Sequence, residues 1–400
     1  MAHLDFYRSL AVPSDRRILF MVLDGLGGLP HVHTGETELE AAKTPNLDRL
    51  AARGELGLST PILPGVTPGS GPAHIGLFGY DPVEHQVGRG VLAALGVGAD
   101  LRPGDVAARI NFCSLNAEGQ VTDRRAGRIG DEIGAPLAER LDAMPDPAGV
   151  EMRVRHVKQY RACVILRGAG LEGDIADTDP LVTGVPPLAP VAQSEGSERA
   201  AALVADFVTR AADALDDQGA ANGVLLRGFD GYSPLPTMGE LYGLTAAAVA
   251  AYPMYLGVAR LAGMAAHPVK DEPDAMVEQV KSLDGADFVF LHYKSTDSKG
   301  EDGDFDAKVA EVEKADGVIG RLVEDFDVVM VTGDHSTPSR MSAHSWHPVP
   351  LLIAGPDARS QNHPGFGERE CVGGSLGHVS ASDVLPLVLA HAGRLRKFGA

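Results

Sequence analysis

Side chains that could bind cations stand at widely separated places in this sequence: Asp24, Asp297, Asp334, His335 and His344. Several carboxylates cannot be buried together without compensation, so such groups either take up protons or hold cations. The adjacent carboxylate and imidazole of Asp334 and His335 can face one cation or two neighbouring cations. Taken singly, each position also fits a turn, a buried ion pair or an interface histidine. Together they predict one metal site.

A serine between two glycines supplies a candidate nucleophile. Ser70 lies in the segment VTPGSGPAH, 66–74, just ahead of a helix expected over 73–77. Backbone amides at the start of a helix can bind a phosphate held on the serine oxygen. The segment matches neither the G-x-S-x-G nucleophile elbow nor the Walker P-loop.

The elements that must position these residues are short buried strands. Apolar runs at 18–23, 288–291 and 328–331 stop at or shortly before Asp24, Asp297 and Asp334. Continuous apolar runs are typical of parallel strands that are covered on both faces. Helices are expected at 44–52, with Thr44 as the cap, and from Phe305 to Val323. The pattern predicts a doubly wound, mostly parallel α/β sheet, and ligands bind at the carboxyl ends of such strands.

A different texture indicates an inserted domain. Polar and apolar residues alternate at 151–157, as in a sheet with one solvated face, and a helix is expected from Ser197 to Leu215. The segment GFDGYSPLPTMG, near residue 230, is interpreted as a hinge or linker. We therefore expect a core formed by 1–105 and 231–400, interrupted by a smaller α+β cap domain over 106–230.

Composition narrows the class of protein. The chain has 400 residues, a hydrophobic content of 44% and a net charge of −19, which favour two globular domains and disfavour nucleic-acid or membrane-surface partners. The N-terminal segment lacks an apolar core of signal-peptide length, and no long apolar stretch follows. A cytoplasmic protein is expected.

Ordered motifs along the whole chain resemble one family. They are MVLDGLGG, KTPNLDRLA, TPGSGPAH, GYDP with GRG, ARINF, DRRAGR, GDHS, AHSWHPVP and the terminal KFGA. The chain resembles the archaeal-type 2,3-bisphosphoglycerate-independent phosphoglycerate mutases of the alkaline phosphatase superfamily. The resemblance implies a phosphatase-like core with a cap, and interconversion of 3-phosphoglycerate and 2-phosphoglycerate through a phosphoserine, without 2,3-bisphosphoglycerate as cofactor.

The same resemblance implies two divalent metal ions. One ion would be held by Asp24, Ser70, Asp334 and His335, with Ser70 as the nucleophile. The other would be held by Asp297, the residue at position 301 and His344. Many relatives have a histidine four residues after the aspartate, whereas this chain has Glu301, with Asp302 and Asp304 as alternatives. A carboxylate there favours Mn²⁺ or Mg²⁺ over Zn²⁺ or Co²⁺.

Substrate recognition is expected to rest on arginines, because a guanidinium binds phosphate or carboxylate oxygens bidentately. The family pattern points to a set of basic residues, of which Arg125 and Arg227 would also act in catalysis: Arg89, Arg124, Arg125, Arg128, Arg227 and, more weakly, Lys294. Asp123 would bind the glycerate hydroxyl. His74 and His378 are expected to support loops.

Two other functions fit parts of the same pattern. A phosphatase or phosphodiesterase of the same superfamily would share Ser70 and both metals, and would release inorganic phosphate. A catalytically silent phosphate-ester-binding protein would be consistent with the changed ligand at Glu301.

Overall fold

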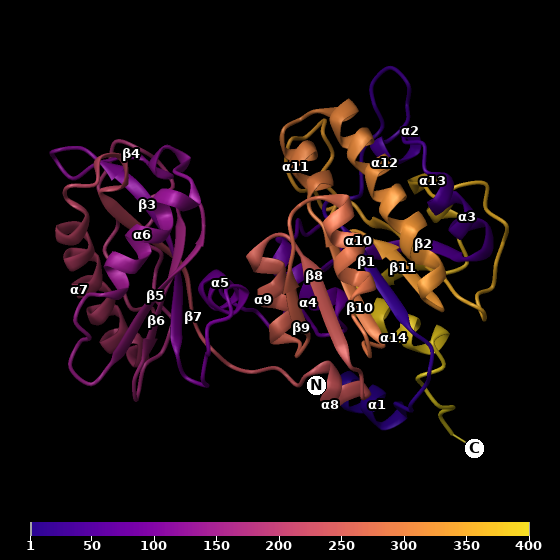
Figure 1. Cartoon of the computed structure of the whole chain (residues 1–400), viewed down its shortest axis with the longest axis horizontal. Coiled ribbons are helices and arrows are strands. Elements are labelled where there is room, and N and C mark those ends of the chain that lie inside the picture. The colour runs from indigo at the N-terminus through magenta and orange to yellow at the C-terminus, as the bar shows by residue number, and fades with distance from the viewer. Residues whose placement is uncertain (1, 400) are drawn as a thin grey trace. The chain divides into compact units, whose positions relative to one another are not determined.

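The computed structural model describes residues 2–399 and divides the chain into two compact units. The first unit contains the chain up to Gln86, Pro236–Tyr252 and the chain from Ala262 onward. The second contains Val87–Leu235 and Pro253–Leu261 (Figure 1). These boundaries differ from the expected insertion over 106–230, because the second unit begins earlier and takes in a later helix. Among the described residues no helix is long and apolar enough to cross a membrane.

An eight-stranded sheet forms the centre of the first unit. Across the sheet the strands are β13 (Gly377–Ser380), β2 (Glu55–Thr60), β12 (Val349–Ala354), β11 (Val328–Thr332), β1 (Ile18–Leu23), β10 (Phe288–Tyr293), β8 (Ala246–Ala250) and β9 (Ala265–Pro268). All neighbours pair in parallel except β12, which runs antiparallel to both β11 and β2. The expected α/β class with a mostly parallel sheet is confirmed.

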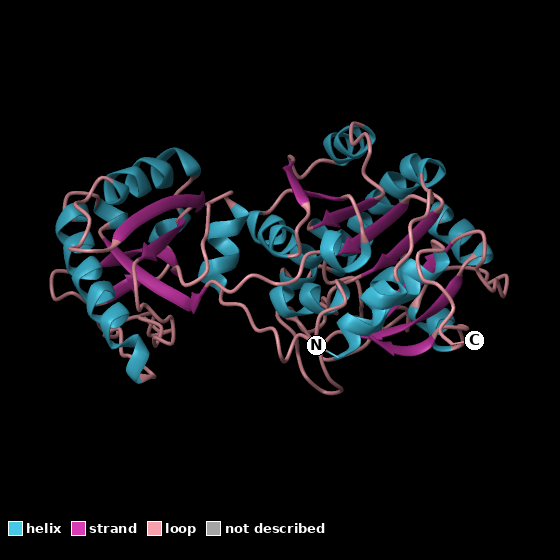
Figure 2. Cartoon of the chain, turned by 90° about the horizontal axis from the view of Figure 1, so that it is seen from below, coloured by secondary structure: helices cyan, strands magenta, loops and turns pink. Residues whose placement is uncertain are grey.

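Helices lie on both faces of this sheet (Figure 2). They are α1 (Ala2–Leu10), α2 (Glu38–Ala41), α3 (Pro45–Arg53), α4 (Ser70–Leu77), α8 (Met238–Tyr242), α10 (Pro273–Lys281), α11 (Ser295–Glu301), α12 (Phe305–Leu322), α13 (Glu368–Val372) and α14 (Ala381–His391). The packing of strand β1 explains why its sequence is apolar throughout. Met21 belongs to the same buried cluster as Val312 of α12, whereas Phe20 packs against Phe78 just after α4. Both faces of the strand are therefore buried and excluded from solvent.

Helix α3 begins where the sequence predicts, but its cap differs. Thr44 makes no side-chain cap hydrogen bond. Instead the buried carboxylate of Asp316, on α12, accepts hydrogen bonds from the backbone amides of Asn46 at 3.0 Å and Leu47 at 2.8 Å. These amides belong to the first turn, which has no partners within its own helix. Thr44 occupies the N-cap position, as expected, but a residue distant in sequence supplies the side-chain cap.

The second unit is an antiparallel sheet with helices. Its strands are β3 (Val106–Leu115), β4 (Val121–Asp123), β5 (Glu151–Lys158), β6 (Arg161–Arg167) and β7 (Gly223–Gly231), in the order β4-β3-β6-β5 with β7 beside β3. Its helices are α5 (Arg89–Gly96), α6 (Asp131–Asp142), α7 (Glu198–Leu215) and α9 (Pro253–Leu261). The interpretation of GFDGYSPLPTMG as a linker was wrong in its first part, since 228–231 belong to β7 and pair with β3.

Helix α9 belongs to the second unit through a close approach that glycine permits. A Cβ at Gly257 would lie 2.0 Å from the carbonyl oxygen of Leu92 in α5, so only glycine allows the two backbones to pack this closely. No hydrophobic periodicity at Gly257 or Leu92 predicts this contact from the sequence.

The Asp316 cap gives a stability prediction. Replacing Asp316 with Ala leaves two amides of α3 without their acceptor, and should lower the free energy of unfolding by about 2 kcal/mol. Urea unfolding followed by the fluorescence of Trp346, the only tryptophan of the chain, measures this in the first unit. Lys314→Ala removes an exposed ion pair from the same helix and serves as the control. Equal stability of the two variants would refute the capping role.

Candidate metal-binding active site

The structure brings together six side chains that the sequence predicts at one site, all in the first unit: Asp24, Ser70, Asp297, Asp334, His335 and His344. His335 lies at the centre of a first group. Its Nε2 atom is 3.3 Å from Asp24 Oδ1, 3.2 Å from Asp334 Oδ2 and 3.2 Å from Ser70 Oγ. Asp24, Asp334 and His335 are fully buried or nearly so, whereas Ser70 is half-buried.

A second group of possible ligands adjoins the first. His344 Nε2 lies 3.6 Å from Asp297 Oδ1, and the rings of His344 and His335 stack with centroids 3.6 Å apart. Asp297 lies in the first turn of α11. Because His335 Nδ1 is also 4.0 Å from Asp297 Oδ1, His335 borders both groups.

Thr337 decides to which group His335 can serve as a ligand. The Thr337 hydroxyl donates to Asp297 Oδ1 at 2.7 Å and lies 2.9 Å from His335 Nδ1. A hydroxyl has one hydrogen, so Thr337 must accept from the Nδ1–H of His335. That tautomer leaves the lone pair on Nε2, which faces Asp24, Asp334 and Ser70. Sequence reasoning missed Thr337, although its place two residues after His335 is a signal.

Glu301 lies at the rim of the second group. It is the last residue of α11, its side chain is 55% exposed, and its Oε1 atom is 3.8 Å from His344 Nε2. Partial burial and the charge of Asp297 raise the pKa of Glu301 above its ordinary value. The alternatives are engaged elsewhere: Asp302 pairs with Lys299, and Asp304 caps α12 through the amide of Ala307.

Lys294 lies among these carboxylates. Its Nζ atom is 3.0 Å from Asp24 Oδ2 and also forms an ion pair with Asp297. Burial alone would lower the pKa of Lys294, but Asp24 and Asp297 outweigh it and raise the pKa. One ammonium does not neutralise three buried carboxylates. Burial and the charges of Asp24 and Asp297 also raise the pKa of Asp334 well above its ordinary value. The cluster therefore fits cations of higher charge.

Two more buried histidines border the first group. His292 Nε2 lies 3.4 Å from Asp24 Oδ2, and His74 Nδ1 lies 2.8 Å from the carbonyl oxygen of Ser70 and 3.5 Å from Asp334 Oδ2. Burial lowers the pKa of His74 to about 3, so its ring is neutral. The neutral ring of His74 lies beside the backbone of Ser70. Sequence reasoning missed His292, which lies on β10. Lys294 follows two residues later, and residues two apart along a strand share a face, so strand alternation was an available signal.

The remaining candidates for substrate recognition all lie in the second unit: Arg89, Asp123, Arg124, Arg125, Arg128 and Arg227. Asp179, which is buried, organises two of them. It accepts two hydrogen bonds from Arg124 at 2.7 and 2.8 Å, and lies 3.4 Å from Arg227 Nη1. Burial would raise the pKa of Asp179, but the hydrogen bonds and charge of Arg124 lower it. Asp179 is a residue that the sequence did not single out.

Asp123 stabilises the loop that carries Arg125 and Arg128. Its carboxylate accepts hydrogen bonds from the amides of Arg125 at 2.8 Å and Gly127 at 2.7 Å. Three successive residues of this loop, 126–128, have φ values of 48°, 65° and 56°. Left-handed backbone at non-glycine residues is strained and persists only where the surroundings hold it. The side chains of Arg125 and Arg128 are exposed.

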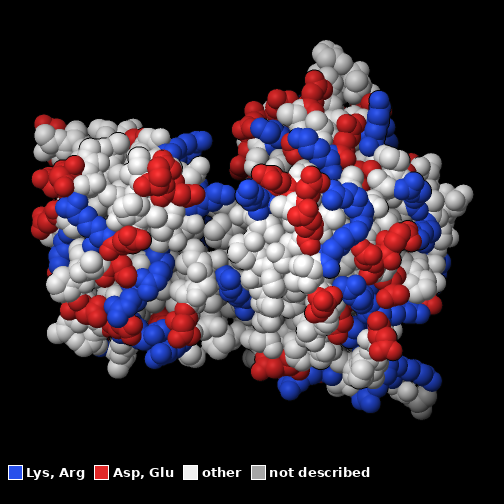
Figure 3. Space-filling model, in the orientation of Figure 1, with Lys and Arg blue, Asp and Glu red and all other residues white. Residues whose placement is uncertain are grey.

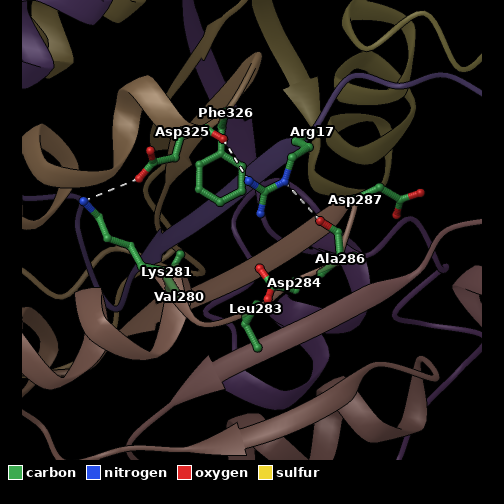
Figure 4. A pocket seen from close by; sticks show the side chains of 10 residues that line it. Arg17, Val280, Lys281, Leu283, Asp284, Ala286, Asp287, Asp325 and Phe326 are labelled. Carbon is green, nitrogen blue, oxygen red and sulfur yellow. Dashed lines mark hydrogen bonds and ion pairs between the residues drawn. The ribbon is translucent and has the colours of Figure 1, made fainter.

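A hollow lies at the other edge of the sheet from the candidate metal site, and different residues line it. It has a volume of about 550 Å³ and lies before the amino ends of β1, β10 and β11 (Figure 4). Arg17 lies over the Phe326 ring and donates to the carbonyl oxygens of Ala286 and Asp325, and Lys281 pairs with Asp325. The basic side chains that line this hollow are thus bound to neighbouring groups of the protein.

On the face drawn in Figure 3, acidic and basic side chains are interspersed over both units.

Comparison with known proteins identifies the family. A sequence model described as 2,3-bisphosphoglycerate-independent phosphoglycerate mutase matches residues 51–220. Proteins bearing that name from Thermus thermophilus and Deinococcus radiodurans are 50% and 46% identical over 399 and 406 residues, covering 98% and 99% of both chains. A solved structure from Pyrococcus horikoshii has 33% identity and a TM-score of 0.83, and covers 97% of this chain and 100% of its own.

A second solved structure is the cofactor-independent phosphoglycerate mutase of Thermoplasma acidophilum. It has 29% identity and a TM-score of 0.71, and the match covers 94% of this chain and 100% of that one. Identity of one half along nearly the full length of both chains places the sequence within a single family. The chain belongs to the 2,3-bisphosphoglycerate-independent phosphoglycerate mutases.

Proposed function

We propose that this chain interconverts 2-phosphoglycerate and 3-phosphoglycerate through a phosphoserine at Ser70. The observation that carries the proposal is the position of Ser70 Oγ, 3.2 Å from His335 Nε2, beside the carboxylates of Asp24 and Asp334. Ser70 is also the first residue of α4, whose opening amides have no side-chain cap and can bind phosphoryl oxygens. The name of the relatives supplies the substrate.

The donor set suits two divalent ions. Asp24, Ser70, Asp334 and His335 would hold one ion, and Asp297, Glu301 and His344 would hold the other. Burial lowers the pKa of His335 well below its ordinary value, so its imidazole is neutral and ready to be a ligand. The oxygen-rich set favours Mn²⁺ or Mg²⁺. When bound, such ions polarise phosphoryl oxygens and lower the pKa of the serine hydroxyl.

In the proposed reaction the Ser70 hydroxyl loses its proton as its oxygen attacks phosphorus in line, and the bond from phosphorus to the glycerate oxygen breaks. The freed glycerate oxygen takes up a proton. Glycerate then turns, its other hydroxyl gives up its proton and attacks the phosphoserine, and the Ser70 oxygen is released and takes up a proton. Lys294, which lies between Asp24 and Asp297, would contact a phosphoryl oxygen as the ions take over its present role as counter-charge. Water must stay out during the turn.

The arginines of the second unit would bind the glycerate carboxylate and the phosphate, with Arg125 and Arg227 assisting the transfer. Arg125 and Arg128 extend from the strained 123–128 loop that Asp123 holds. Arg124 and Arg227 are oriented by Asp179, which leaves other guanidinium N–H groups for substrate. This assigns the second unit the role of a substrate-binding cap.

Replacing Ser70 tests the nucleophile. Ser70→Ala should lower mutase kcat roughly 10³-fold or more, because no oxygen remains to accept the phosphoryl group. Acid-quenched wild type incubated with 2-phosphoglycerate should yield a phosphorylated peptide containing residue 70, and the variant should not.

Ser295→Ala is the control, since that hydroxyl donates to the exposed Asp271 carboxylate. Full mutase activity in Ser70→Ala would contradict the scheme. Release of inorganic phosphate by the wild type in place of the isomer would indicate a phosphatase instead.

The role of Glu301 predicts a change in metal stoichiometry. Glu301→Ala should bind one Mn²⁺ per chain where the wild type binds two, by isothermal titration of metal-free protein. Glu301→His should shift the preference toward Zn²⁺, because imidazole is a softer ligand than carboxylate. Asp302→Ala is the matched control on the same turn. If Asp302→Ala loses the ion and Glu301→Ala keeps it, the neighbouring carboxylate is the ligand.

The Asp179 anchor predicts a loss of substrate affinity. Asp179→Asn keeps the shape of the side chain but loses the charge that holds Arg124 and Arg227, so kcat/KM for phosphoglycerate should fall about 10- to 100-fold. Bound Mn²⁺ should stay at two per chain. Asp217→Asn breaks an exposed pair with Arg140 in the same unit and should change little. An unchanged kcat/KM in Asp179→Asn would contradict the anchor.

A further inference from the structure

A buried lysine lies behind the candidate site and has no part in the proposed reaction. Lys308, on α12, is fully buried. Its ammonium donates to three backbone carbonyl oxygens: Gly25 at 2.9 Å, Gly27 at 3.1 Å and Thr337 at 2.8 Å. An ammonium has three donors, so these contacts use all of them.

Such a group is expensive to bury, which makes its position informative. Transfer of an ammonium out of water is tolerated only with complete hydrogen bonding and nearby negative charge. Burial lowers the pKa of Lys308, and the carboxylates of Glu38 and Glu368 act in the opposite direction. A leucine or methionine would fill the same apolar face of α12 without this cost.

The three carbonyls belong to the two segments that carry the first ligand group. Gly25 and Gly27 follow Asp24 in the turn after β1, and Thr337 follows Asp334 and His335 after β11. Lys308 therefore joins the two turns from behind. The turns also touch directly, since the amide of Gly25 donates to Asp334 Oδ1 at 3.1 Å.

The carboxylates of the half-buried Glu368 and the buried Glu38 hold amides of the same segments. Glu368 Oε1 accepts from the amide of Gly28 at 2.9 Å, and Glu38 Oε1 accepts from the amide of Ser339 at 2.7 Å. The space between the turns is tight, because a Cβ at Gly27 would lie 1.9 Å from Ser336 Oγ. Carbonyls and amides of both turns are thus fixed by side chains from elsewhere in the chain.

We infer that Lys308 is a positioning residue, which holds segments 24–28 and 334–339 in the geometry that the first divalent ion needs. The inference rests on the proposed metal site. Lys308 acts through the backbone on Asp24 and Asp334, and through Thr337 on the ring of His335. In its absence the carbonyl of Thr337 loses this donor, and the carbonyls of Gly25 and Gly27 are left sharing the amide of Thr337, at 3.2 and 3.1 Å. The ammonium that joins the two turns is then lost, and their carbonyls are less well satisfied.

The test is Mn²⁺ binding to metal-free protein, measured by isothermal titration without substrate. Lys308→Met keeps the length of the side chain and removes the donors. It should weaken one of the two Mn²⁺ sites about 10- to 100-fold, the usual effect of losing a partner behind the ligands. Val312→Ala is the matched control, because it removes buried apolar volume one turn along the same helix. It should lower the melting temperature while leaving Mn²⁺ affinity within about twofold of the wild type.

Mn²⁺ affinity in Lys308→Met equal to that in Val312→Ala would overturn the inference. If Lys308→Met does not fold, Lys308→Gln, which keeps two N–H donors, decides by the same comparison and should show an intermediate loss. A wild-type chain that binds no Mn²⁺ would overturn the proposed metal site and this inference with it. Wild-type binding together with unchanged affinity in the Lys308 variants would overturn the inference alone.

Discussion

The carboxylates of Asp24, Asp297 and Asp334 lie buried together at the carboxyl ends of β1, β10 and β11. In a dry site their mutual repulsion must be balanced by positive charge or by protons. Lys294 supplies one positive charge against three carboxylates, which is insufficient to balance them. The rest of the site is arranged around that requirement: neutral imidazoles face the carboxylates, and the serine hydroxyl lies at their edge.

The parallel sheet brings these carboxylates together, and side chains from neighbouring elements hold the turns that carry them. Parallel strands end at one edge, so residues far apart in sequence meet there without long loops. The turns that follow β1 and β11 are then held by Lys308, Glu38 and Glu368. Hydrogen bonds from these side chains hold the turns that carry the candidate ligands, as partners behind a metal site do. Burying three charges lowers the free energy of unfolding, and such a loss is expected where the charged residues serve a function.

The sequence predicts the local parts of this arrangement well. Apolar runs followed by Asp or Asp-His predicted the strands β1 and β11 and the proximity of Asp24, Asp334 and His335, because strand burial and strand ends are local signals. Ordered motifs predicted the family. Contacts between distant segments were not predictable in this way: the Asp316 cap of α3, the Asp179 anchor and the close packing at Gly257 depend on tertiary structure. Lys308 had a signal, since it precedes Val312 by four residues on the apolar face of α12, where a charge is out of pattern.

A crystal structure of the protein grown with Mn²⁺, with anomalous scattering recorded for manganese, tests the central claim most directly. The account predicts two peaks per chain, one enclosed by Asp24, Ser70, Asp334 and His335 and the other beside Asp297 and His344. It also predicts that the Lys294 ammonium has moved away from one of its two present carboxylate partners. No peak at the first position, with Lys294 still bridging Asp24 and Asp297, would contradict the account.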